Sequence, residues 1–388
     1  MRLLLSIPRL ILKPGRLILL VLITVAVIAG LAYSSWITAQ ARAVGALSTT
    51  YDTPVVAWVT RQVTEDPTVE DTSVAGVPVT VVRPAGDGPW PAVMVLNGAT
   101  DEGRLDEDVL QLATGLSRVG HYVVVMDSPG VTNSTFSTDA IDQTVRVMQS
   151  LAAGNDVEEG ELSLIGLGLG GTIALLAAQE PGLAARIPVV VAIAPVTDFI
   201  EIGRLATTGF HRVEGGFIEQ PVPLEIRITA ANAVLEALPA NATRRIIKRE
   251  LEATEDGQDP LARLDEIPRD LLDRDTRAVV QFLANKDPRK YDRLFANLPA
   301  PVQDAVRDLS PVVDAQRLRA RVELAVSAND LYVPLAQARA LEQVAPNVHV
   351  TVSDAFSSTQ TRPTIGGPGD FLRLDAMIVR ALHEAHAS

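Results

Sequence analysis

The stretch at residues 162–179 (LSLIGLGLGGTIALLAAQ) limits the possible folds of this chain more than any other. Three of its first four residues (LSLI) are apolar, and they predict a short buried strand. The segment GLGLGG at residues 166–171 predicts a tight turn, and residues 172–179 are good helix formers. Glycine is typical of a turn where a strand and a helix converge, because the approaching backbones leave no room for a Cβ. We therefore expect a sharp strand-to-helix turn here.

Apolar strands and amphipathic helices alternate along most of the chain. The strands are expected at residues 77–82, 92–96, 122–126, 189–193, 322–327 and 348–352, and the helices at residues 105–117, 138–152, 335–344 and from residue 371. This alternation predicts an α/β fold with a mostly parallel sheet and helices on both faces. Pro78 lies in the first of these strands and predicts an edge strand, since proline cannot donate a hydrogen bond to a neighbouring strand.

The alternation stops between about residues 199 and 309. This part carries many charged residues, helical periodicity and several prolines, including Pro221 and Pro223. It predicts a helical insertion rather than a second sheet domain. We expect one domain at residues 73–388 that contains this insertion, preceded by a polar, irregular stalk at residues 44–72.

Residues 1–43 differ from the rest of the chain. Four basic residues (Arg2, Arg9, Lys13, Arg16) precede an apolar run from residue 17 to residue 37, and no acidic residue occurs before Asp52. The run matches the roughly 20 residues that a bilayer-spanning helix needs. We therefore expect a single-pass membrane protein with a cytoplasmic basic end, one N-terminal transmembrane helix and the large domain outside the cytoplasm.

Two alternatives remain for this N-terminal segment. A cleaved signal peptide could end at residues 39–41 or 41–43. A buried N-terminal helix is the second alternative, and the one-sided charge pattern argues against it. The apolar run is longer than the roughly 7–15 residues typical of a signal peptide, which favours an uncleaved anchor.

Charge and cysteine content exclude several classes of function. The formal net charge of −13 argues against a nucleic-acid partner, because phosphates bind basic surfaces. The absence of cysteine excludes disulfides, thiolate catalysis and cysteine-based zinc sites. Gly166, Gly168 and Gly171 also fit the Gly-x-Gly-x-x-Gly dinucleotide pattern, but several strands precede them and Asp198 comes late for the acid of that pattern. We expect no cofactor and no metal.

The order of these elements resembles the α/β-hydrolase superfamily over most of residues 77–388. The resemblance implies that the glycine turn is the nucleophile elbow, which reads Gly-x-Ser-x-Gly in that superfamily, and that the insertion is a helical lid. It also places the oxyanion loop at Asn97-Gly98, with an ordinary Asn-Gly turn as an equal alternative. Together with the backbone amide of Leu169, this loop would form a polar cradle for a ligand oxygen.

The resemblance also implies a catalytic acid, and two triad positions at which the expected serine and histidine are missing. Asp330, in AVSANDLYVP at residues 325–334, follows a late strand and falls at the position of the acid. Gly168 falls at the nucleophile position and has no side chain, and Ser358 (or Ser357) stands where the histidine is expected. None of the five histidines of the chain lies in that loop, and His211 could reach the site only from the insertion.

These residues predict a membrane-anchored α/β-hydrolase-like domain that lacks triad chemistry, because a triad loses several orders of magnitude in rate when one member is missing. Without its histidine, Asp330 is expected to have a structural role. The predicted function is binding or scaffolding, with an unknown small molecule or protein as partner. The alternative is an active hydrolase of ester or amide bonds that uses an unidentified nucleophile or base.

Overall fold

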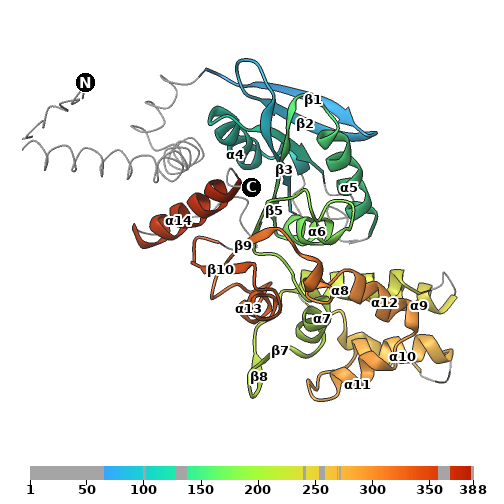
Figure 1. Cartoon of the computed structure of the whole chain (residues 1–388). Coiled ribbons are helices and arrows are strands. Elements are labelled where there is room, and N and C mark those ends of the chain that lie inside the picture. Colours follow the sequence, from blue (N-terminus) through green and yellow to red (C-terminus); the bar gives the residue numbers. More distant parts are fainter. Residues whose placement is uncertain are drawn as a thin grey trace, which may run out of the picture.

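The fold is built on one eight-stranded sheet with the strand order β1-β2-β4-β3-β5-β6-β9-β10 (Figure 1). The computed structural model describes residues 65–98, 102–127, 138–238, 242–252, 258–268, 270, 272–356 and 368–385. The strands of the sheet are β1 (Thr68–Val74), β2 (Val77–Arg83), β3 (Trp90–Leu96), β4 (Tyr122–Met126), β5 (Val157–Leu167), β6 (Val189–Ile193), β9 (Arg321–Val326) and β10 (Val348–Val352).

The sheet is parallel from β4 to β10, and β1 and β2 are added in antiparallel pairing. Successive residues of its buried strands face opposite sides of the sheet. On one side, Met94 of β3 packs in a core with α5 (Thr138–Ala152), α6 (Leu169–Gln179) and α13 (Leu335–Val344). On the other side, Val93 and Val95 pack with α4 (Glu107–Arg118), and Val189 packs with α14 (Pro368–Ala385). The predicted mostly parallel sheet with helices on both faces is confirmed.

The first strands differ from the prediction. β2 is not an edge strand, because β1 pairs along its whole length and Ser73 lies opposite Pro78. Pairing between β2 and β4 begins only at Val79, so Pro78 withholds no hydrogen bond from β4. The sheet thus begins at Thr68, inside the residues predicted as a stalk.

One part of the fold prediction is wrong. No helix among the described residues is long and apolar enough to cross a membrane, so the structure provides no transmembrane helix in front of the sheet. The apolar run at residues 17–37, on which that prediction depended, lies outside the described residues. The extracytoplasmic location of the domain stays a prediction from the sequence.

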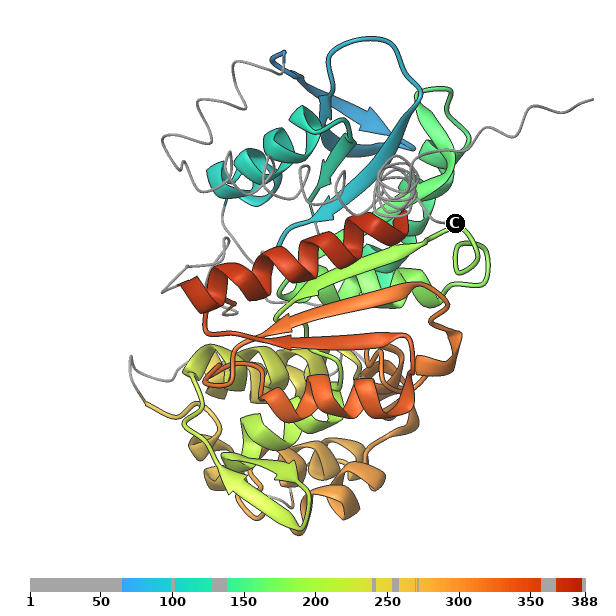
Figure 2. The ribbon, with the colours of Figure 1, turned by 60° about the vertical axis from the view of Figure 1, so that its left-hand side comes forward.

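The insertion between β6 and β9 is mainly helical and has a core of its own, which includes Val279, Phe282, Tyr291 and Phe295. It gathers at the end of the sheet that carries β9 and β10 (Figure 2). Its elements are α7 (Phe199–Thr208), α8 (Leu224–Glu236), α9 (Ala242–Glu252), the 3-10 helix η2 (Ala262–Glu266), α10 (Arg274–Leu283), α11 (Tyr291–Ala296), α12 (Ala300–Asp308) and a hairpin of β7 (Phe210–Val213) and β8 (Gly216–Glu219). The sequence did not predict this hairpin.

A buried ion pair fastens α14 to the sheet. The Glu323 side chain, in the middle of β9, is fully buried, and Arg380 of α14 donates to both of its oxygens at 3.0 and 2.8 Å. Arg321 lies 3.1 Å from the same carboxylate, and Arg380 also donates to Thr351 at 2.9 Å. Glu323 is thus the acceptor on which two cations converge.

We expect Glu323→Gln to lower the free energy of unfolding by roughly 1–3 kcal/mol, because it removes the carboxylate that accepts from Arg321 and Arg380, whose side chains are 28% and 30% exposed. Urea unfolding of both proteins measures the difference. The control is Asp304→Asn, which removes an exposed pair with Arg307 on α12 and should cost no more than about 0.5 kcal/mol. Equal losses in the two variants would contradict a special role for Glu323.

Candidate functional site

The strand-to-helix turn has the backbone geometry of a nucleophile elbow. β5 ends at Leu167, Gly168 has φ 53° and ψ −122°, and α6 begins at Leu169. The Gly168 N–H donates to the carbonyl of Ile193 at 2.8 Å, which ties the turn to the end of β6. Residues with a Cβ rarely adopt these angles and are strained when they do. The sequence places glycine at this strained position.

Steric contacts explain the two flanking glycines. A Cβ at Gly166 would overlap the carbonyl oxygen of Gly170 and the Cα of Gly171. A Cβ at Gly170 would overlap the carbonyl oxygens of Leu96 and Asn97, at the end of β3. A Cβ at Gly168 would instead meet no atom within 4 Å. The two flanking positions of the elbow therefore require glycine, whereas the nucleophile position has room for a side chain.

The loop after β3 lies against the elbow. Asn97 is buried, its Nδ2 donates to the Gly103 carbonyl at 2.5 Å, and its Oδ1 accepts the Gly98 N–H at 2.7 Å. A Cβ at Gly98 would come within 3.0 Å of the Leu167 carbonyl oxygen. The Leu169 amide begins α6 and has no acceptor inside the helix. Of the two backbone amides in the predicted polar cradle, the Gly98 amide donates to the Asn97 side chain. The Leu169 amide has no acceptor within α6, so it is the donor that a ligand oxygen could use.

Asp330 shapes the loop in which it lies. It is buried, and its Oδ1 accepts the N–H groups of Tyr332 at 2.8 Å and Val333 at 2.9 Å. These bonds turn the chain between β9 and α13. Ser358, at the predicted histidine position, lies outside the described residues.

An apolar cluster connects the elbow, the Asp330 loop and the insertion. Its buried members and the partly buried side chains packed on them come from α6, the loop after β6, α7, α8 and the Asp330 loop: Leu169, Val196, Phe199, Ile202, Ile226, Tyr332 and Val333. The start of α6 is thus covered by apolar side chains from the insertion and from the Asp330 loop.

Asp198, just after β6, caps the first helix of the insertion. Its Oδ1 accepts the amides of Ile200 at 2.8 Å and Glu201 at 3.1 Å. Burial raises the pKa of this carboxyl group above its usual value. The sequence contained the signal, since an Asp followed three residues later by a Glu is typical of a helix start. This role leaves no support for Asp198 as the acid of a dinucleotide site.

The histidines with described side chains do not complete a triad at the elbow. His211 lies on β7, and Figures 1 and 2 place the β7–β8 hairpin away from α6. Burial lowers the pKa of His211, and its Nδ1 has no hydrogen-bond partner among the described residues. His121 is buried before β4, and His349 is exposed on β10. Among the described residues, no group of three histidine or carboxylate side chains could hold a metal ion.

Comparison with solved structures gives many matches of low identity. One is dipeptidyl peptidase 4 of Porphyromonas gingivalis, at 11% identity and a TM-score of 0.47, covering 85% of this chain and 37% of that protein. An esterase of Pyrococcus furiosus matches at 13% identity and a TM-score of 0.44, covering 81% of this chain and 92% of that protein. A putative dienelactone hydrolase of Klebsiella pneumoniae matches at 13% identity and a TM-score of 0.43, covering 81% of this chain and 100% of that protein. This chain therefore spans little more than a third of the dipeptidyl peptidase.

A comparison with curated proteins gives no match. The family model of the X-Pro dipeptidyl-peptidases (S15 family) matches residues 75–342, which is more than half of the 388 residues. The match runs from β2 to α13 and includes the elbow, the insertion and the Asp330 loop. The chain therefore belongs to the X-Pro dipeptidyl-peptidase (S15) family and, with it, to the α/β-hydrolase superfamily.

Proposed function

We propose that this protein uses the α/β-hydrolase fold to bind a ligand and does not catalyse hydrolysis through a triad. The observation that carries the proposal is Gly168, which adopts the elbow conformation but has no atom that could attack a substrate. An elbow without a hydroxyl or thiol cannot form an acyl-enzyme, since that step needs an activated nucleophile.

The remaining groups suit binding. The Leu169 amide at the start of α6 is a hydrogen-bond donor for an oxygen atom, and the apolar cluster of the insertion and the Asp330 loop lies beside it. Apolar side chains with a few placed polar groups are typical of the lining of ligand sites. The partner is proposed to be a small molecule or a protein segment, and the net charge of −13 argues against nucleic acid.

The family match supports a second candidate function, hydrolysis of ester or amide bonds. The matching family is named for an X-Pro dipeptidyl-peptidase activity, and peptide hydrolysis would follow if another residue supplied the nucleophile. His211, with its unpartnered Nδ1, is the described histidine that could act as a base after a movement of the insertion. The following experiments separate the two candidates.

The purified protein is expected to remain unlabelled by a fluorophosphonate probe, because the elbow offers no serine. Gel fluorescence measures labelling, and an active serine hydrolase serves as the positive control. Labelling that disappears when one specific serine is replaced by alanine would identify a nucleophile and support the second candidate.

Gly168→Ser alone is expected to give no hydrolysis of a p-nitrophenyl ester, because it supplies an oxygen without a base. It should also lower the free energy of unfolding by about 1–3 kcal/mol, the cost of a Cβ in a strained backbone conformation. Gly120→Ser is the matched control, since Gly120 also has a positive φ and free space for a Cβ. A Gly168→Ser protein that is already a competent esterase would show that a base is present.

The double variant Gly168→Ser/Ser358→His is expected to gain weak esterase activity if Asp330 faces the restored pair. The loop that carries Ser358 starts beside the Asp330 loop, because Ser327 donates to Asp354 at 3.0 Å. Initial rates for wild type, both single variants and the double variant measure the effect. An inactive, folded double variant would show that Asp330 does not face the restored pair.

A further inference from the structure

A cavity of about 240 Å³ lies where the insertion rejoins the sheet domain. Its walls come from α5, α6 and α12, which are labelled in Figure 1, and from the chain between α12 and β9, which includes the 3-10 helix η4 (Ala315–Arg317). The cavity contacts α6 at its end, whereas the elbow is at its start, about 15 Å away at roughly 1.5 Å per residue. It is therefore separate from the elbow site.

Part of the cavity lining is apolar. Ile141 of α5 and Leu176 of α6 line the cavity, and both side chains are otherwise buried. Pockets for drug-sized ligands have volumes of roughly 300–1,000 Å³. The cavity is smaller than these pockets and therefore suits a small molecule with a short apolar body.

A buried polar side chain in the lining has an unused acceptor. Gln179 lines the cavity and is 5% exposed, and its Nε2 donates to the Pro311 carbonyl at 2.6 Å. Its Oε1 receives no hydrogen bond within the described part of the chain. Because a buried polar group is rarely left without a partner, this oxygen indicates that a hydrogen-bond donor occupies the cavity.

Three carboxylates in the lining are also unused. They belong to Asp142 of α5, Glu180 at the end of α6 and Asp308 of α12. None of these side chains forms a hydrogen bond or an ion pair with another described residue. Asp142 and Glu180 lie on the side of the sheet domain, and Asp308 lies on the side of the insertion. The cavity therefore has free negative charges on two of its sides.

The two cations of the lining do not neutralise these carboxylates. Arg317 lies 2.9 Å from Asp314, and Arg307 lies 3.6 Å from Asp304. Each guanidinium group is thus paired with an acid three residues before it in the chain. The positive charges are compensated locally, and the excess charge in the cavity is negative.

We propose that this cavity binds a small alkyl diamine. An ammonium group has three N–H donors and no acceptor, so it matches carboxylates and the Gln179 Oε1, which only accept. Acids on two sides of the cavity suit a molecule with a charge at each end, and a methylene chain between them can pack on Ile141 and Leu176. The three carboxylates do not form a group that could hold a metal ion, which favours an extended organic cation.

Isothermal titration of the full-length protein with 1,5-diaminopentane tests the proposal. We expect it to bind roughly fivefold more tightly than 1-aminopentane, because its second ammonium group meets an acid on the other side of the cavity. The uncharged 1,5-pentanediol, which has the same length, should give no measurable binding. Magnesium chloride alone should not give a comparable signal.

Carboxylate variants locate the binding. Glu180→Gln and Asp308→Asn are each expected to weaken diamine binding by roughly fivefold, since each removes one partly exposed ion pair. Asp275→Asn is the matched control, because it removes an exposed, unpaired carboxylate of α10 that does not line the cavity. It should leave the affinity unchanged. Hydrogen exchange should slow with bound diamine in residues 138–142, 176–180 and 307–317 only.

Several results would overturn the proposal. Absence of diamine binding, or equal binding of the diol, would show that the carboxylates recognise no cation. Equal binding of 1-aminopentane would indicate a site for a single ammonium group, such as a lysine side chain, and equal binding of magnesium would indicate unspecific attraction of cations. Affinity that is unchanged in both carboxylate variants would place the diamine elsewhere. None of these measurements involves the elbow, so their outcome is independent of the proposed function.

Discussion

The close approach of two backbones at the elbow is the constraint on which the site depends. The start of α6 lies so near the end of β3 that a Cβ at Gly170 would overlap the Leu96 carbonyl. This contact fixes the direction of α6, the position of the Asn97 loop and the orientation of the Leu169 amide. The chain retains this geometry although residue 168 has no reactive side chain. Retention of the form without the nucleophile is the physical basis for proposing a binding role.

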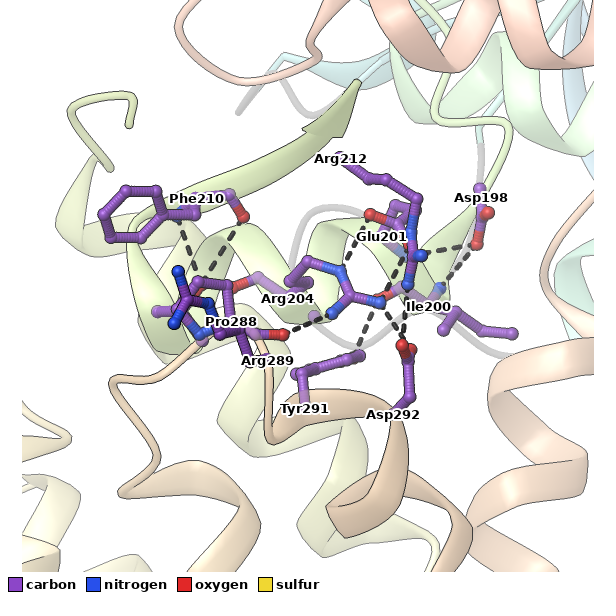
Figure 3. Close-up of polar contacts among 12 residues, drawn as sticks. Asp198, Ile200, Glu201, Arg204, Phe210, Arg212, Pro288, Arg289, Tyr291 and Asp292 are labelled. Carbon is purple, nitrogen blue, oxygen red and sulfur yellow. Dashed lines mark hydrogen bonds and ion pairs between the residues drawn. The ribbon is translucent and has the colours of Figure 1, made fainter. Parts of the chain in front are cut away.

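The insertion adds a second level of organisation. It has its own core, yet its apolar side chains contact Leu169 at the elbow. Its Gln220 side chain contacts the Asp330 loop. Ion pairs among Glu201, Arg204, Arg212 and Asp292 join α7, β7 and α11 of the insertion (Figure 3). Arg204 is held on all sides by carboxylates, a carbonyl and aromatic rings, whereas Arg212 meets solvent. One buried and one half-exposed cation therefore share the same two carboxylates.

Local sequence patterns predicted the sheet and the elbow because their signals are short-range. Apolar runs mark strands that are buried on both faces, and steric exclusion requires glycine at positions 166 and 170. β1 was missed because six of its seven residues are exposed, so TVEDTSV has no apolar pattern. The ion pair between Arg204 and Asp292 could not be predicted, because the two residues are 88 apart in sequence and many other charges could have paired. The transmembrane prediction rested on residues 17–37, which the structure does not describe.

The position of the insertion also affects how the chain reaches this fold. β6 and β9 are neighbours in the sheet, although residues 194–320 separate them in sequence. Closing a flexible loop costs entropy that grows with its length, by about 0.6 kcal/mol for each doubling, and such distant pairings slow folding. An insertion with its own core can fold first and bring its ends together. A folded insertion would shorten the effective loop that must close before β9 pairs with β6.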